Sequence, residues 1–156
     1  MTTLKHILVA SDGSDGALKA AGFAGALARA AGAHLTILVI HSDELLMPYA
    51  WGAGEWPALP ANAVISIDEI RAEVEKASAE NEIRKTVEAV GELPTPATSV
   101  QHWGHPGEEI CRYAVDHEVD LIVIGTRGRS TFTRLLLGSV STQVANHASC
   151  PVTLVR

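Results

Sequence analysis

Apolar and polar positions along this chain follow two alternating periods, which predict strands alternating with helices. Short aliphatic and β-branched runs have the near-continuous apolar character of strands that are buried on both faces. The predicted strands are residues 4–10, 33–41, 97–103, 120–125 and 150–156. The intervening segments carry apolar residues at spacings of three and four, which is the helical period. The predicted helices are residues 14–31, 66–90, 106–118 and 140–148.

The helix boundaries have their own signals. Gly32 ends the first helix, Pro106 opens the third, and Ser66 with Glu69 forms a capping-box pattern at the start of the second. The apolar stripe of the second helix is predicted to comprise Ile67, Ile70, Val74, Ala77, Ile83, Val87 and Val90. Alternating strands and helices predict one α/β domain over residues 1–156, a parallel sheet with helices on both faces.

One segment fits neither period. Residues 41–66 contain several prolines and glycines together with Trp51 and Trp56, and are too broken for a long element. We expect this loop to border a functional region. Its tryptophans have two interpretations that the sequence leaves open, packing within the loop or closing over a ligand base.

Composition narrows the class of protein. Aromatic residues make up 4% of the chain, so we expect a core of Ala, Val, Ile and Leu. The net charge of −6 argues against nucleic acid as a partner, and no apolar run reaches the roughly 18 residues of a membrane span. The N-terminus leads directly into a strand, so we expect a cytoplasmic protein without membrane insertion. Cys111 and Cys150 are expected to be reduced packing residues.

The segment from Gly125 to Ser141 carries the strongest chemical signal. Gly125 and Gly128 follow a predicted strand, and Gly138 precedes a helix start with Ser139 beside it. Glycine lets a ligand approach the backbone closely, and the free N–H groups of a helix N-terminus favour anions. The pattern predicts a phosphate site built from backbone amides at the carboxyl ends of the first and fourth strands.

Other phosphate motifs do not match, and a structural alternative stays open. The chain has no GxxxxGK[ST] loop, and no GxGxxG follows the first strand. The alternative is that the glycines form only a turn and a helix entry. His102 and His105 have an HxxH spacing, but a strand-to-loop segment does not place two imidazoles on one face, so we predict no metal site there.

The pattern G-x2-G-x9-G-S, together with the early VASDGS and the terminal CPVTLVR, resembles the universal stress protein family, in particular its nucleotide-binding branch. The resemblance covers nearly the whole chain and is weakest near residues 43–65. It implies a five-stranded parallel sheet in the order 3-2-1-4-5, an ATP ligand and a homodimer formed through the C-terminal strand.

The resemblance also implies roles for individual residues. Asp12 would meet the ribose hydroxyls, because a carboxylate accepts two hydrogen bonds from a diol. Ile40 would offer its backbone N–H and C=O to adenine. The full set of implied nucleotide-binding residues is Ala10, Ser11, Asp12, Ile40, Gly125, Thr126, Arg127, Gly128, Arg129, Gly138, Ser139, Val140 and Ser141. Magnesium would be held mainly by the phosphates, since no DxD-type cluster is present.

The expected function is that of an ATP-binding, stress-response regulatory protein without catalytic residues. Slow ATP hydrolysis or autophosphorylation at Ser130, Thr131 or Thr133 is one alternative, although no base for hydrolysis is evident. A dimeric scaffold that binds no nucleotide is another. Enzymes that adenylate their substrates carry SGGxDS after the first strand, where this chain has SDGSDG, and this difference counts against that class.

Overall fold

The five strands form one parallel sheet in the order β3-β2-β1-β4-β5, and both the class and the order predicted from the sequence are confirmed. The computed structural model describes residues 3–41, 67–127 and 137–156. The strands are β1 (His6–Ala10), β2 (His34–His41), β3 (Thr98–Trp103), β4 (Leu121–Gly125) and β5 (Val152–Val155). The helices are α1 (Asp15–Ala31), α3 (Ile67–Val90), α4 (Pro106–Asp116) and α5 (Ser139–His147).

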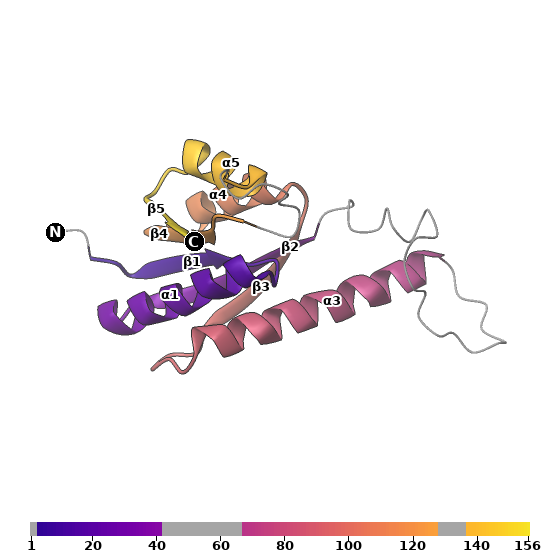
Figure 1. The fold of residues 1–156 in the computed structure, drawn as a ribbon, viewed down its shortest axis with the longest axis horizontal. Helices are drawn as coiled ribbons and strands as arrows, with labels where there is room; N and C mark the ends of the chain where they lie inside the picture. The colour runs from indigo at the N-terminus through magenta and orange to yellow at the C-terminus, as the bar shows by residue number, and fades with distance from the viewer. Residues whose placement is uncertain (1–2, 42–66, 128–136) are drawn as a thin grey trace.

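The sheet is the middle of three layers. Helices α1 and α3 cover one face, and α4 and α5 cover the other (Figure 1). Successive strand residues point to opposite faces. Ile7, Val9 and Ile37 therefore join the apolar cluster under α1 and α3, while Leu8 and Leu38 join the cluster under α4 and α5. The buried core is largely Ala, Val, Ile and Leu, as the low aromatic content predicts.

Helix α1 packs unusually closely on α3. A Cβ at Gly25 would lie only 2.3 Å from the carbonyl oxygen of Val90, so only glycine permits this approach. The Ser14 hydroxyl accepts the Ala17 N–H at the start of α1, and Gly32, with φ of 66°, ends the helix in the left-handed conformation. The predicted end of this helix is confirmed.

The predicted buried stripe of α3 is only partly correct. Val90 is buried and Ile83 is half-buried, but Ala77 is exposed and Val87 is 44% exposed. The buried positions are instead Ala79, Glu82 and Thr86. Glu82 packs against Gly13 in the loop after β1, and the Thr86 hydroxyl bonds to Ser11 in the same loop. The Ser66 cap and the side chains of Ile67, Ile70 and Val74 lie outside the described part.

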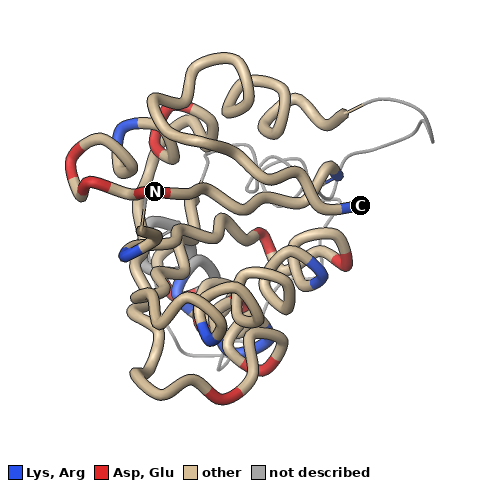
Figure 2. The backbone as a smooth tube through the Cα atoms, turned by 90° about the vertical axis from the view of Figure 1, so that its left-hand side faces the viewer, with Lys and Arg blue, Asp and Glu red and all other residues tan. Residues whose placement is uncertain are grey.

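Charged residues lie mainly on the helices and loops around the sheet. In the view of Figure 2, basic and acidic positions are interspersed rather than gathered into one basic face. Among the described helices, none combines the length and the apolar character that a membrane crossing requires.

Asp120 holds the amino-terminal ends of β1 and β4 together. Its carboxylate accepts the N–H groups of Lys5, at 2.7 Å, and His6, at 2.9 Å. Its own N–H donates to the His6 carbonyl at 2.9 Å. The backbone hydrogen bond from Lys5, followed by that from His6, lowers the pKa of Asp120 below the ordinary 3.8, because both favour the charged form.

Asp120→Asn should therefore lower the melting temperature near neutral pH, because a neutral amide is a weaker acceptor. A carboxyl group with a lowered folded-state pKa stabilises the fold above its unfolded pKa, and this contribution is lost as pH falls through the folded pKa. The difference in melting temperature between wild type and variant should shrink as pH falls below about 3.8. Thermal unfolding from pH 2 to 7 checks this, with Asp116→Asn as the control for loss of an exposed carboxylate. A difference that is independent of pH would contradict it.

Candidate functional site

The candidate site lies at the carboxyl edge of the sheet, where strand order reverses. From β1 the chain adds β2 and β3 on one side, and later adds β4 and β5 on the other. Ala10 is in register with Ile124 of β4 and with Leu38 of β2. The segments after β1 and β4 therefore leave the sheet as neighbours. Ligands of open parallel sheets bind at such a reversal point.

Position 125 must be glycine because the first turn of α1 packs directly against it. A Cβ at position 125 would lie 2.7 Å from the carbonyl carbon and oxygen of Gly16, and one at Gly16 would lie 2.7 Å from the Arg127 carbonyl oxygen. The sequence suggested close approach of a ligand as the reason for glycine at position 125, and the structure gives a second reason, the packing of α1. This contact sets the loop after β1 against the loop after β4.

Thr126 connects three parts of the site through its backbone. Its N–H donates to the Val155 carbonyl, and its carbonyl accepts the Gly138 N–H, both at 2.8 Å. The Ser141 hydroxyl approaches the same carbonyl at 3.3 Å. These contacts bring Gly138, at the start of α5, beside the end of β4.

Helix α5 begins at this edge of the sheet, beside the end of β4. Gly138 is the N-cap residue, and no side chain caps the helix. The N–H groups of Ser139, Val140 and Ser141 are in the first turn, where no acceptor exists within the helix. The Ser141 hydroxyl donates to the Gly138 carbonyl at 2.9 Å, so its proton is used within the first turn of the helix. Such a turn favours an anion.

Asp12 lies in the loop between β1 and α1 and is half-buried. Its Oδ1 accepts the Ser14 N–H at 3.0 Å, a turn that fixes the carboxylate. A carboxylate oxygen can accept more than one hydrogen bond, so the contact with Ser14 does not by itself prevent Asp12 from binding a diol.

The backbone N–H and C=O of Ile40 face the β1 side of β2, just beyond the last residue of β1. The Leu38 carbonyl accepts the Ser11 N–H, whereas the His41 carbonyl accepts the Gly104 N–H beyond β3. Backbone groups alternate sides along a parallel strand, so those of Ile40 face the β1 side. Because β1 ends in register with Leu38, they face the site.

A hydroxyl pair behind this loop was not predicted from the sequence. Ser11 Oγ and Thr86 Oγ1 lie 2.7 Å apart, and both residues are buried. Glu82, one helical turn earlier on α3, packs against Gly13. A polar residue every four positions within the stripe of α3 was the available signal.

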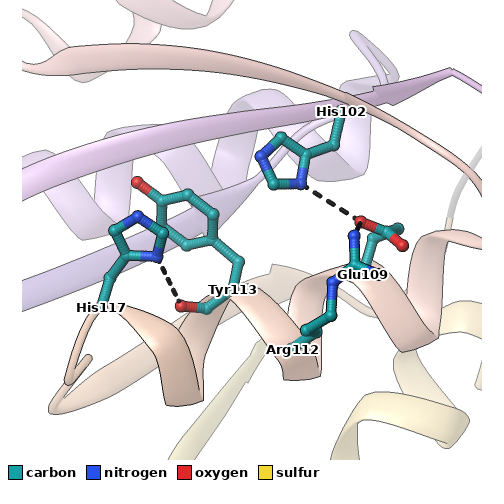
Figure 3. A network of polar contacts seen from close by, with 5 residues as sticks. All are labelled: His102, Glu109, Arg112, Tyr113 and His117. Carbon is teal, nitrogen blue, oxygen red and sulfur yellow. Dashed lines mark hydrogen bonds and ion pairs between the residues drawn. The ribbon is translucent and has the colours of Figure 1, made fainter.

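A second polar cluster lies beside β3 (Figure 3). Glu109, which is buried at the start of α4, pairs with His102 at 3.2 Å and with Arg112. The rings of Tyr113 and His117 stack with centroids 3.8 Å apart. His102 lies opposite Ile40 in the β2–β3 register, so this cluster fixes the outer strand beside the site.

The remaining predicted residues are placed as follows. Ala10 ends β1 and is buried, Arg127 is exposed, and Val140 packs on the cluster under α4 and α5. Predictions that concern Gly128, Arg129, Ser130, Thr131, Thr133, Trp51 and Trp56 lie outside the described residues. Within residues 3–41, 67–127 and 137–156, no three His, Cys, Asp or Glu side chains form a group suited to a metal ion.

Comparisons with known proteins agree with this architecture. The model of the universal stress protein family matches residues 3–156. A universal stress protein of Thermus aquaticus, named for the 3′ region of QAH/OAS sulfhydrylase, is 38% identical over 152 residues and covers 97% of this chain and 98% of its own.

Two solved structures are similar over nearly their full length. Universal stress protein UspA from Lactobacillus plantarum has a TM-score of 0.75 and 29% identity, covering 100% of both chains. A universal stress protein in complex with cAMP has a TM-score of 0.64 and 25% identity, covering 99% of this chain and 98% of that one. The family match and these relatives, together with the fold, show that the chain belongs to the universal stress protein family.

Proposed function

We propose that this protein is a regulatory ATP-binding protein, with the nucleotide held at the carboxyl ends of β1 and β4. The observation that carries the proposal is the convergence of three kinds of group at one edge: the amides that begin α5, the Asp12 carboxylate and the backbone of Ile40. The similar universal stress protein in complex with cAMP supports an adenine nucleotide as the ligand class.

Each part of the nucleotide has a matching chemical partner. The first-turn amides of α5 would receive phosphate oxygens, and Asp12 would accept the ribose hydroxyls. The N–H and C=O of Ile40 would pair with an acceptor and a donor on adenine. Arg127, exposed beside this edge, would add positive charge, and Mg²⁺ would be bound through the phosphates.

Regulation follows from binding without a chemical step. The described residues provide fixed hydrogen-bonding groups for recognition, and the proposed role requires only that nucleotide occupancy changes the affinity for a partner. ATP hydrolysis and autophosphorylation are separate outcomes, measurable as release of phosphate or transfer of label to the protein.

Isothermal titration with Mg-ATP should detect binding to the wild type, and Asp12→Asn should weaken it about tenfold or more. Asparagine still accepts the Ser14 N–H but lacks the charge that strengthens bonds to the ribose. With 2′,3′-dideoxy-ATP, wild type and variant should bind alike, because the hydroxyls that distinguish them are missing.

Asp15→Asn, an exposed carboxylate in the first turn of α1, is the matched control and should bind ATP like the wild type. AMP and cAMP in the same titration separate ATP from other adenine nucleotides. No binding of any of the three to the wild type would contradict the proposal and favour the nucleotide-free scaffold.

Gly138→Val should abolish ATP binding while most of the fold remains. A Cβ there would lie 3.3 Å from the Thr126 carbonyl oxygen, so a branched side chain would displace the Gly138–Thr126 hydrogen bond and the amides of α5. Ala145→Val adds the same side chain at an exposed position of α5 and should retain binding. Titration with circular dichroism measures both properties. Unchanged affinity in Gly138→Val would place the phosphate site elsewhere.

We also propose a homodimer formed through β5. Ile122 and Thr126 donate N–H groups to the carbonyls of Pro151 and Val155, so odd-numbered residues of β5 face β4. The backbone groups of Val152 and Leu154 then point to the open edge, since β5 pairs only with β4 among the described strands. Such an edge accepts a second copy of the strand across a two-fold axis.

Leu154→Pro should convert the dimer into a monomer, because proline removes an N–H from the open edge. Ser99→Pro is the matched control, since the Ser99 N–H faces outward from the other edge strand, β3. Light scattering after size-exclusion chromatography measures the mass. A wild type with the mass of one chain, or a dimeric Leu154→Pro, would refute the β5 interface.

A further inference from the structure

Four polar groups form a directional chain from α3 to the loop that carries Asp12. Thr86 Oγ1 donates to the Glu82 carbonyl at 2.6 Å, since a carbonyl oxygen only accepts. The Thr86 hydroxyl proton is therefore not available to Ser11. The Ser11 hydroxyl, 2.7 Å away, must then donate to Thr86. The lone pairs of Ser11 are left to accept the Gly13 N–H at 3.2 Å.

This chain fixes the turn on both sides of Asp12. Ser11 is anchored through its N–H, which donates to the Leu38 carbonyl, and through its hydroxyl, which donates to Thr86. Gly13 adopts φ of 73°, a conformation that favours glycine, and its N–H is held by Ser11. With both neighbours held, the backbone of Asp12 has little freedom.

Glu82 bounds the same turn sterically. A Cβ at Gly13 would lie 3.0 Å from Glu82 Cγ, so the turn lies directly on the buried stem of this side chain. The Ser78 hydroxyl donates to Glu82 Oε1 at 3.2 Å, which orients the carboxylate along α3. Helix α3 therefore contacts the turn both by hydrogen bonding and by packing.

We propose that Thr86 is a positioning residue for the ribose subsite, which holds Asp12 in its binding geometry through the Ser11 hydroxyl. The inference rests on the proposed nucleotide function, with Asp12 as the group that contacts the ligand. Thr86 touches no ligand. Because coupling is reciprocal, bound nucleotide stabilises the contact between this turn and α3.

Thr86→Val tests the proposal, because valine keeps the branched shape and removes the hydroxyl. The buried Ser11 hydroxyl then lacks its acceptor and adopts another orientation. Its oxygen is no longer held in position to accept the Gly13 N–H. We expect ATP affinity to fall about fivefold to tenfold, as the binding-competent turn becomes less populated. The Gly13 amide should exchange with solvent faster, measured by NMR in the absence of nucleotide.

Two controls separate positioning from general loss of stability. Thr86→Ser keeps the hydroxyl and should restore affinity and Gly13 protection. Thr36→Val removes another buried threonine hydroxyl, which bonds to His6 at 2.9 Å toward the amino-terminal ends of the strands. This variant should leave ATP affinity and Gly13 protection unchanged. Ser11→Ala removes the middle of the chain and should reproduce Thr86→Val, which provides a second variant if valine impairs folding.

The outcomes distinguish this inference from the proposed function. Unchanged Gly13 exchange in both Thr86→Val and Ser11→Ala overturns the positioning role, whatever the wild type binds. Equal loss of affinity in Thr36→Val and Thr86→Val overturns it as well. A wild type that binds no adenine nucleotide refutes the proposed function, while the Gly13 exchange still reports whether Thr86 holds the turn.

Discussion

The candidate site depends on the close approach of the first turn of α1 to the end of β4. A Cβ on Gly125 would meet the Gly16 carbonyl, and one on Gly16 would meet the Arg127 carbonyl, so this packing places the loop after β1 against the loop after β4. The Thr126 carbonyl then draws Gly138 and α5 to the same edge. These two backbone contacts place the loop that carries Asp12 and the start of α5 at the same edge of the sheet.

The sheet and most element boundaries could be predicted because they depend on local patterns. Unbroken aliphatic runs indicate buried parallel strands, and glycine at positions such as Gly32 ends a helix through its own backbone preference. The family resemblance supplied the strand order, which periodicity does not contain. Both are confirmed by the sheet and by the family match.

The sequence is least informative where a distant neighbour determines a position. The packing of Gly16 on Gly125 leaves no signal in the residues around position 125. The helical spacing predicted a buried Val87, but Thr86 is buried instead because its hydroxyl bonds to Ser11. Ser11 lies 75 positions away in the chain, so the residues around Val87 do not reveal this contact. A polar pair of this kind is hard to recognise from the sequence, since each partner alone resembles a surface residue.

The central claim is that backbone amides at the start of α5 hold the phosphates of an adenine nucleotide whose ribose lies on Asp12. A crystal structure of the protein grown with excess Mg-ATP tests this most directly. We expect phosphate oxygens within hydrogen-bonding distance of the N–H groups of Ser139–Ser141, and ribose hydroxyls at the Asp12 carboxylate. A nucleotide bound at another surface, with this edge of the sheet closed by the protein itself, would contradict the account.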